Sequence, residues 1–291
     1  MMDSFSQFYQ NMPLHINPTV VSVGSFSLGW YPLMYIMAFS VAYLLLGYRV
    51  KHDGQADQFQ ISNFKFQIIA WDFMFYAVLG VLIGGRLGYV LFYNLPYYLH
   101  NPLAVISPYD FAAGRWTGIY GMSYHGGLIG VVLVSVLFVR KYELNFWKFA
   151  DFVVPVVPAG YFFGRIGNFL NLELYGRIAD SPLSMQFPLW TGAGPYPRYP
   201  SQLFEAFFEG LVLFTILWTI RNKKKFDGFN LTVYVIGYAA ARFGVEFFRQ
   251  PDPQLNFVFY GLTMGQLLSL AMALVGIFIY TLRSRKFVNN N

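Results

Sequence analysis

The sequence predicts an all-α polytopic membrane protein with about seven transmembrane helices and a small extracytoplasmic head. Three observations support this fold class. Hydrophobic residues make up 56% and charged residues only 12% of the 291 residues, and the mean hydropathy is +0.43. Apolar segments of about 20 residues, the length that crosses a bilayer core, recur along the chain. Basic residues concentrate in every second connection between these segments. We therefore treat residues 1–291 as a single integral membrane domain.

Seven apolar segments are the predicted membrane spans. The fourth contains Pro155 and Pro158, which a membrane helix tolerates where neighbouring groups satisfy the freed carbonyls. Residues 1–25 contain no Lys or Arg and several Pro and Asn, so we expect a retained polar or interfacial segment rather than a cleavable signal peptide. In chain order the predicted spans are Tyr31–Tyr48, Ile69–Phe92, Ile119–Val139, Phe149–Gly167, Leu203–Ile220, Phe229–Phe247 and Leu262–Leu282.

The distribution of basic residues predicts the orientation. Every lysine lies after the first, third, fifth or seventh span, so these connections and the C-terminus are expected in the cytoplasm and the N-terminus outside. The long connections at about 93–118 and 168–201 then form, with the N-terminal segment, the extracytoplasmic head. The residues that carry this signal are Arg49, Lys51, Lys65, Arg140, Lys141, Lys148, Arg221, Lys223, Lys224, Lys225, Arg283, Arg285 and Lys286.

The composition excludes several classes of function. The chain has no cysteine, which rules out a disulfide framework and a thiol nucleophile of its own. Its 4 histidines are scattered and form no metal-ligand pattern, so we expect neither a metal nor a cofactor. The net charge of +6 follows from the membrane topology and does not require a nucleic-acid partner.

The remaining basic residues are all arginines that do not follow the topology pattern. Arginine presents a planar fork and stays charged when desolvated, so phosphate or carboxylate recognition is the predicted reason. Arg86, Arg165 and Arg242 each precede a glycine by two residues and lie about 20–24 Å along their spans, that is, at a similar depth. An intramembrane arginine is costly unless it is paired or solvated. The full set is Arg86, Arg115, Arg165, Arg177, Arg198, Arg242 and Arg249.

Acidic partners for these arginines are present in the sequence. Tyr238, Arg242 and Glu246 are spaced four residues apart and share one helix face. Glu205 and Glu209 share a face of the preceding span in the same way. Two interpretations stay open at this point: a structural network of Arg–Glu pairs, or a network that leaves at least one arginine for a phosphate group near the outer leaflet.

Two polar segments lie at the outer ends of spans. Residues 164–176 carry one Arg, two Asn and one Glu out of an apolar run, which is typical of a site for an anionic, lipid-borne group; the alternative is a helix end whose arginine reaches the membrane surface. His125 begins the third span beside two glycines. It is either a structural hydrogen-bonding residue or a proton acceptor for a thiol or hydroxyl, since an ordinary histidine pKa is about 6.5.

These residues together resemble the bacterial prolipoprotein diacylglyceryl transferase family. The stretch 164–176 follows that family's signature, Gly-Arg-x-Gly-Asn-Phe-x-Asn-Gly/Ser-Glu-x-x-Gly, and the likeness covers nearly the whole chain. The sequence departs from the family at Leu172, where the signature has Gly or Ser, and at Gly29 and Tyr199, where some members have His. Supporting motifs are Trp30-Tyr31, Leu33-Met34-Tyr35, Gly84–Asn94, His125–Gly130, Pro197–Leu203 and Val245–Asp252.

The resemblance implies a reaction and its partners. A diacylglyceryl group would move from phosphatidylglycerol to the lipobox cysteine in the signal peptide of a prolipoprotein, with release of sn-glycerol 1-phosphate. This is the first step of lipoprotein lipidation, and it would take place in the bacterial plasma (inner) membrane. The alternative is a membrane transporter or binding protein for an anionic lipid or solute, which would carry polar residues at several depths. The inner halves of the second, fourth and sixth spans are nearly all apolar, which favours the transferase.

A mechanism consistent with these residues assigns roles for the implied reaction. The catalytic candidates are His125 as the base, Arg165 and Arg242 as stabilisers of the leaving phosphate, and Tyr31 as a hydrogen-bonding neighbour. Arg86 is either a third phosphate ligand or half of a structural pair. The predicted substrate-binding residues are Arg165, Asn168, Glu173, Gly176, Arg86, Tyr238 and Glu246, and no metal ligand is predicted.

Overall fold

The computed structural model describes residues 2–24, 26–54, 59, 61–107, 109–110, 115–116, 121–251 and 257–289. The chain divides into two compact units, and it passes from one to the other within a helix each time. The first unit consists of Met1–Tyr48 and Ala150–Asn291, and the second unit is Arg49–Phe149.

The second unit is built on two long helices that pack through glycines. A Cβ atom at Gly84 would overlap the main-chain oxygen of Gly126, and one at Gly130 would overlap that of Gly80. Such contacts allow the close backbone approach that is common between membrane helices. The elements are α4 (Asn63–Phe92), α5 (Leu95–His100), the 3₁₀ turn η2 (Pro102–Val105), the antiparallel strands β3 (Tyr109–Asp110) and β4 (Arg115–Trp116), and α6 (Tyr124–Lys141).

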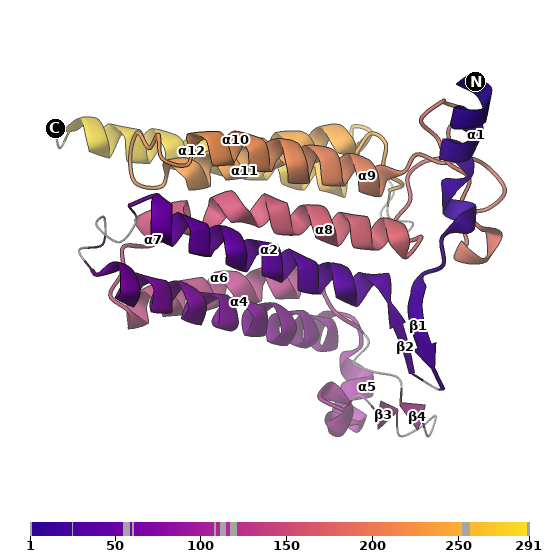
Figure 1. The fold of residues 1–291 in the computed structure, drawn as a ribbon, viewed down its shortest axis with the longest axis horizontal. Helices are drawn as coiled ribbons and strands as arrows, with labels where there is room; N and C mark the ends of the chain where they lie inside the picture. The colour runs from indigo at the N-terminus through magenta and orange to yellow at the C-terminus, as the bar shows by residue number, and fades with distance from the viewer. Residues whose placement is uncertain are drawn as a thin grey trace. The chain divides into compact units, whose positions relative to one another are not determined.

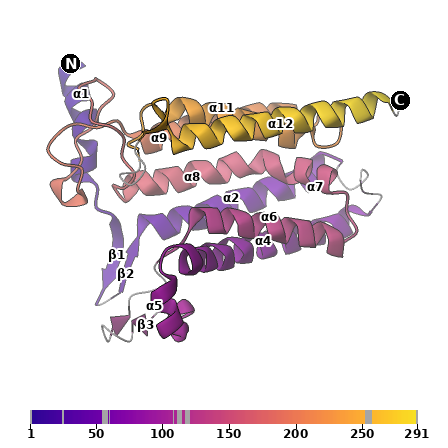
Figure 2. The same ribbon diagram turned by 180° about the vertical axis from the view of Figure 1, so that it is seen from behind.

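The first unit contains the remaining helices. In both ribbon views α8, α10, α11 and α12 run side by side, and α1 and the C-terminal end of α12 lie at opposite ends of this unit (Figures 1 and 2). Its elements are α1 (Met2–Asn11), η1 (Met12–His15), β1 (Thr19–Val23), β2 (Phe26–Gly29), α2 (Trp30–His52), α7 (Phe146–Val153), η3 (Val154–Val156), α8 (Val157–Leu170), η4 (Leu189–Thr191), α9 (Ser201–Glu205), η5 (Ala206–Val212), α10 (Leu213–Ile220), α11 (Phe229–Val245), β5 (Phe257–Phe259), β6 (Leu262–Thr263) and α12 (Met264–Asn289), with the ends of α2 and α7 extending into the second unit.

The described residues include 5 helices that are long and apolar enough to cross a membrane, and they coincide with the first, second, fourth, fifth and seventh predicted spans. The helix α6, with 18 residues, and α11, with 17 residues, lie at the third and sixth predicted spans. The third was predicted to begin at Ile119, which is outside the described residues; α6 begins at Tyr124 because the Ser123 side chain caps its first turn. The five helices are Trp30–His52, Phe64–Phe92, Phe146–Leu170, Ser201–Ile220 and Met264–Phe287.

Two of these spans are not regular α-helices. Pro155 lies in the 3₁₀ turn η3 and Pro158 in the first turn of α8, where a missing N–H costs little. The fourth predicted span therefore accommodates both prolines, with a short 3₁₀ turn between α7 and α8. In the fifth span η5 is a π-helix of 7 residues, a form that is rare and frequently found at functional sites.

The connection after α8 folds around a small apolar core. Leu172, Met185 and Phe187 are buried there together with Phe169 at the end of α8. Tyr9 of α1 packs against the same core, and the Gln186 N–H donates to the Gln10 carbonyl over 2.7 Å. The N-terminal segment and the connection 168–201 thus pack together as one substructure, and its place in an extracytoplasmic head stays a prediction. The other predicted part, at about 93–118, belongs to the second unit and lies partly outside the described residues.

Candidate functional site

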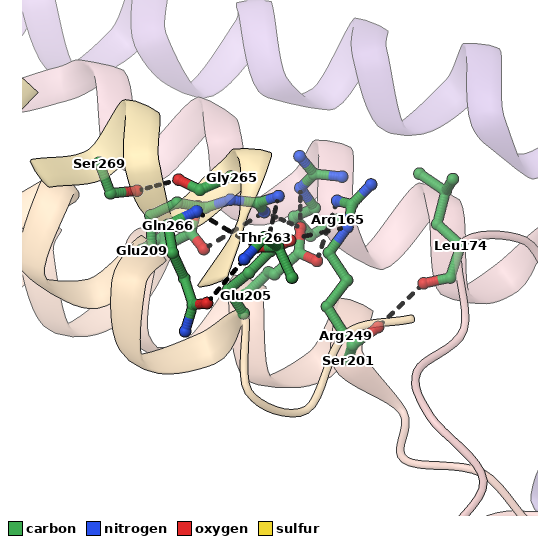
Figure 3. Close-up of polar contacts among 12 residues, drawn as sticks. Arg165, Leu174, Ser201, Glu205, Glu209, Arg249, Thr263, Gly265, Gln266 and Ser269 are labelled. Atoms are coloured by element: carbon green, nitrogen blue, oxygen red, sulfur yellow. Dashed lines mark hydrogen bonds and ion pairs between the residues drawn. The ribbon is translucent and has the colours of Figure 1, made fainter. Parts of the chain in front are cut away.

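Charged side chains from α8, from α9 with η5, and from α11 with the residues that follow it converge near the C-terminal end of α8, forming what we call the arginine–glutamate cluster (Figure 3). The carboxylates of Glu205, Glu209 and Glu246 are 0%, 0% and 5% exposed. Buried carboxylates need compensating charge, and guanidinium groups provide it. The members of the cluster are Arg165, Glu205, Glu209, Arg242, Glu246 and Arg249.

Arg165 connects the cluster to the signature stretch. Its Nε lies 2.8 Å from Oε2 of Glu205 and donates to the Tyr161 hydroxyl over 2.8 Å. Its Nη1 donates to Oδ1 of Asn168 over 3.2 Å, and Nδ2 of Asn168 donates to Oε1 of Glu173 over 2.9 Å. Three predicted site residues, Arg165, Asn168 and Glu173, therefore form one chain of hydrogen bonds that begins on α8.

Arg242 lies between the acidic residues of two spans. Its Nη2 is 2.9 Å from Oε2 of Glu246, one helical turn away. Its Nη1 is 3.4 Å from Oε2 of Glu205 and 3.8 Å from Oε1 of Glu209. Glu209 projects from the π-helix η5, whereas Glu205 ends α9. The Arg242–Glu246 pair predicted from helical spacing is thus confirmed, and tertiary contacts join Arg165 and Arg242 through Glu205.

The turn that follows α8 explains one departure from the family signature. Leu172 has a φ of 57° and Leu174 a φ of 58°, in the left-handed region that glycine adopts without strain. A Gly at position 172 therefore suits the backbone of this turn. Here the Leu172 side chain is 1% exposed in the apolar core of the connection, so its packing offsets the cost of the backbone conformation.

Gly176 ends the signature at a close backbone approach. A Cβ atom there would overlap the main-chain oxygens of Phe248 and Tyr199. The Gly176 N–H donates to the Tyr199 carbonyl over 2.8 Å, and the Arg177 N–H donates to the Phe248 carbonyl over 2.9 Å. The structure therefore gives Gly176 a positioning role, joining the signature to the segment after α11, and its contact with substrate stays a prediction.

Two arginines that break the topology rule bind main-chain carbonyls. Nε of Arg177 donates to the Arg249 carbonyl over 2.8 Å and its Nη2 to the Glu246 carbonyl over 3.3 Å. Nε of Arg198 donates to the Ala193 carbonyl over 2.6 Å and its Nη1 to the Gly176 carbonyl over 3.1 Å. These guanidinium groups satisfy carbonyls of irregular backbone, which is a different reason for their presence from phosphate recognition.

The second unit holds two predicted site residues, Arg86 and His125. Arg86 donates from Nε to the Val105 carbonyl over 2.7 Å and from Nη2 to the Ala104 carbonyl over 2.6 Å. His125 is exposed in the first turn of α6, two residues after the capping Ser123. Their predicted roles stay predictions.

The two predicted tyrosines belong to the first unit. The Tyr31 hydroxyl, in the first turn of α2, lies 3.1 Å from the Tyr35 hydroxyl. The Tyr238 ring packs edge-on against Tyr161 with a centroid separation of 5.8 Å. Tyr238 therefore adjoins the arginine–glutamate cluster through an aromatic contact.

Sequence reasoning missed Tyr161 and Thr263, and it named Arg249 only as one of the arginines that do not follow the topology pattern. Tyr161 lies four residues before Arg165, so helical spacing alone could have indicated it. Arg249 follows Glu246 by three residues but lies beyond the end of α11. Thr263 approaches Glu246 only through the tertiary fold. Among the described residues, no group of three or more His, Asp or Glu side chains could hold a metal ion.

These features define a class of protein: a multi-pass, mostly helical membrane protein with a buried arginine–glutamate cluster. Comparison with known proteins is more specific. The family profile for prolipoprotein diacylglyceryl transferase matches residues 18–282. A phosphatidylglycerol–prolipoprotein diacylglyceryl transferase of Chlorobaculum tepidum is 45% identical over 280 residues, covering 95% of this chain and 93% of its own. The protein of that name from Francisella tularensis subsp. novicida is 48% identical over 263 residues, covering 90% and 91%. The chain belongs to the prolipoprotein diacylglyceryl transferase family.

Proposed function

We propose that this protein is an enzyme that transfers the diacylglyceryl group of phosphatidylglycerol to the lipobox cysteine of prolipoproteins. The observation that carries the proposal is the joining of Arg165 and Arg242 through one buried carboxylate, Glu205, in a chain that is 45% identical to a transferase of that name over 95% of its length. Two fixed guanidinium groups are suited to a phosphate ester that gains charge as it leaves.

The chemistry is a displacement at carbon. The cysteine sulfur forms a bond to the terminal glyceryl carbon of the lipid, and the bond from that carbon to the phosphate oxygen breaks. The thiol loses its proton, and sn-glycerol 1-phosphate leaves with the bonding electron pair. Arg165 and Arg242 stabilise the charge that develops on this leaving group. Nη2 of Arg165 has no hydrogen-bond partner among the described residues and is a donor suited to this task.

A base must accept the thiol proton, and this chain has no cysteine, so the nucleophile belongs to the substrate. His125 is the proposed acceptor because a neutral imidazole suits proton removal near neutral pH. Its exposure at the start of α6 supports access by a substrate thiol. Asn168 and Glu173 orient Arg165, since their side chains continue its hydrogen-bond chain.

The same proposal includes the membrane arrangement. The helices α6 and α11 supply the third and sixth of seven spans in the bacterial inner membrane. The N-terminus and the head are periplasmic and the C-terminus is cytoplasmic, which is supported by the positions of all the lysines. The separation of α1 from the C-terminal end of α12, at opposite ends of the first unit, agrees with this orientation (Figure 1).

The test uses purified protein, phosphatidylglycerol and a synthetic lipobox peptide, with mass spectrometry of the products. We expect a diacylglyceryl mass on the cysteine peptide, release of glycerol phosphate, and no adduct on a peptide with serine in place of cysteine. Arg165→Ala is expected to abolish both products, whereas Arg285→Gln, on the exposed end of α12, is expected to retain them. Absence of any adduct from folded wild-type protein across several peptides would reject the proposed reaction and direct attention to lipid binding or transport.

A further inference from the structure

The guanidinium group of Arg249 lies among carboxylates without a hydrogen bond to any of them. Its Nη1 is 3.6 Å from Oε1 of Glu205, and its Nε is 4.0 Å from Oε2 of Glu246. Both separations exceed the roughly 2.7–3.2 Å of an N–H···O hydrogen bond. The shortest ion pairs of Arg165 and Arg242 are 2.8 and 2.9 Å. Of the three cluster arginines, Arg249 therefore makes the longest contacts with carboxylate oxygens.

The main chain of Arg249 is held firmly, so a loose backbone does not account for these long contacts. Its carbonyl accepts a hydrogen bond from Nε of Arg177 over 2.8 Å. Arg249 also forms an antiparallel bridge with Gly176, the last residue of the signature. A fixed backbone thus presents a guanidinium group whose hydrogen-bonding capacity is unused within the described residues.

Glu246 cannot move closer to Arg249 without losing other contacts. Its Oε1 accepts a hydrogen bond from the Thr263 hydroxyl over 3.1 Å, and its Oε2 lies 2.9 Å from Nη2 of Arg242. The carboxylate also rests against the start of α12, because a Cβ atom at Gly265 would lie 2.7–2.9 Å from its atoms. Figure 3 shows Thr263, Gly265 and Gln266 grouped at this helix start.

Glu205 is likewise held in place by contacts with other residues. Its Oε2 lies 2.8 Å from Nε of Arg165 and 3.4 Å from Nη1 of Arg242, and the Tyr161 hydroxyl is also 3.4 Å away. The side chain is fully buried. Rotation toward Arg249 would weaken its contacts with two other guanidinium groups. Neither acidic neighbour can therefore satisfy Arg249.

We propose that Arg249 is a third substrate-binding guanidinium and donates hydrogen bonds to the phosphate of phosphatidylglycerol, beside Arg165 and Arg242. A phosphodiester presents two non-bridging oxygens, which accept the paired donors of an arginine fork. The Arg249 side chain is 19% exposed, against 14% for Arg165 and 15% for Arg242, so it is the most accessible of the three. This inference rests on the proposed function, because that function supplies the phosphate.

The test compares two variants of Arg249. Arg249→Gln removes the positive charge and the paired guanidinium donors, whereas Arg249→Lys keeps the charge alone. Arg285→Gln is the matched control, an exposed arginine of α12 outside the cluster. The measurements are the KM for phosphatidylglycerol in mixed micelles, kcat, and the inhibition constant of glycerol phosphate. We expect Arg249→Gln to raise KM and the inhibition constant by about 10-fold or more, as the loss of a charge-assisted contact implies, with a smaller change in kcat. Arg249→Lys should be intermediate and Arg285→Gln unchanged.

A second measurement separates this inference from the proposed reaction. Native mass spectrometry compares bound phosphatidylglycerol with diacylglycerol, which lacks the phosphate. Wild-type protein should retain phosphatidylglycerol preferentially, and the Arg249→Gln variant should lose the preference. If wild-type protein transfers nothing but shows this Arg249-dependent preference, the reaction is wrong and the inference stands. Unchanged binding preference, or a fall in kcat with KM and the inhibition constant unaltered, would overturn the inference. If Arg249→Gln fails to fold, the lysine variant supplies the same comparison.

Discussion

The hydroxyl of Tyr161 donates a hydrogen bond to Oε2 of Glu209 over 2.6 Å and accepts one from Nε of Arg165 over 2.8 Å. One side chain on α8 therefore couples Arg165 to a carboxylate on the π-helix η5. This contact depends on a close helix approach, because a Cβ atom at Gly210 would lie 2.8 Å from Cβ of Phe162. The π-helical turn thus brings Glu209 to the cluster where the two helices nearly touch.

Replacing Tyr161 with phenylalanine should weaken both the fold and lipid binding. The change leaves a fully buried carboxylate and a guanidinium without the hydroxyl, which we expect to cost about 1–3 kcal/mol of unfolding free energy. KM for phosphatidylglycerol should rise because Arg165 loses one of its fixed contacts. Thermal unfolding in detergent and steady-state kinetics measure the two effects. Tyr196→Phe, at a side chain that is 60% exposed, is the control, and equal behaviour of the two variants would contradict the coupling.

Glycine substitutions at two leucines of the strained turn after α8 should change the unfolding free energy in opposite directions. Leu174 has a φ of 58° and is 45% exposed, so Leu174→Gly should raise the unfolding free energy by at most about 1 kcal/mol through relief of backbone strain. Leu172 has a similar φ but is buried, so Leu172→Gly should lower it by about 2–5 kcal/mol through loss of packing. Thermal or denaturant unfolding of both variants provides the comparison. Stabilisation by Leu172→Gly would show that its side chain contributes little to the core.

Sequence patterns predicted those parts of the fold and site that depend on helical periodicity. Apolar length gave the five long spans, and the four-residue spacing of Arg242 and Glu246 gave their ion pair. The contact of Arg249 with Glu205 was not predicted because Arg249 lies beyond the end of α11, and Thr263 was missed because it reaches Glu246 from the short strand β6, so no helical spacing applies to either residue. Leu172 was recognised only as a departure, since its left-handed backbone follows from tertiary packing.

Arginines outside the cluster bind main-chain carbonyls instead of the predicted anionic group. A planar fork binds phosphate and carbonyl oxygens by the same geometry, so the sequence cannot distinguish these uses. Arg177 and Arg198 were expected to recognise an anionic group, yet they donate to main-chain carbonyls of the connections that surround the signature. The path of those connections determines which carbonyls lack a main-chain hydrogen-bond donor.

Because α4 and α6 pack closely, alanine substitutions at two glycines of α6 should differ in their effect on stability. Gly130→Ala places a methyl group against the Gly80 main chain, and such overpacking should cost about 1–3 kcal/mol. Gly127, on the same helix, has room, because its Cβ would lie 3.4 Å from the nearest atom. Gly127→Ala should be neutral or stabilising, since alanine favours the helix. Thermal unfolding of the two purified variants decides the matter, and similar melting temperatures would argue against glycine-mediated packing.

The last helix begins with a capping box that also positions Glu246. The Thr263 N–H donates to Oε1 of Gln266 over 3.0 Å, the Gln266 N–H donates to Oγ1 of Thr263 over 3.3 Å, and the Thr263 hydroxyl donates to Glu246. Thr263→Val should therefore cost about 1–3 kcal/mol and lower kcat/KM, because Glu246 loses a donor and α12 loses its cap. Thr263→Ser keeps the hydroxyl and should behave as wild type. Thr232→Val, buried in α11 with a hydroxyl that bonds only its own helix, is the control for both readouts. If serine at 263 were as defective as valine, the methyl group would be the important contact and the hydroxyl would have no positioning role.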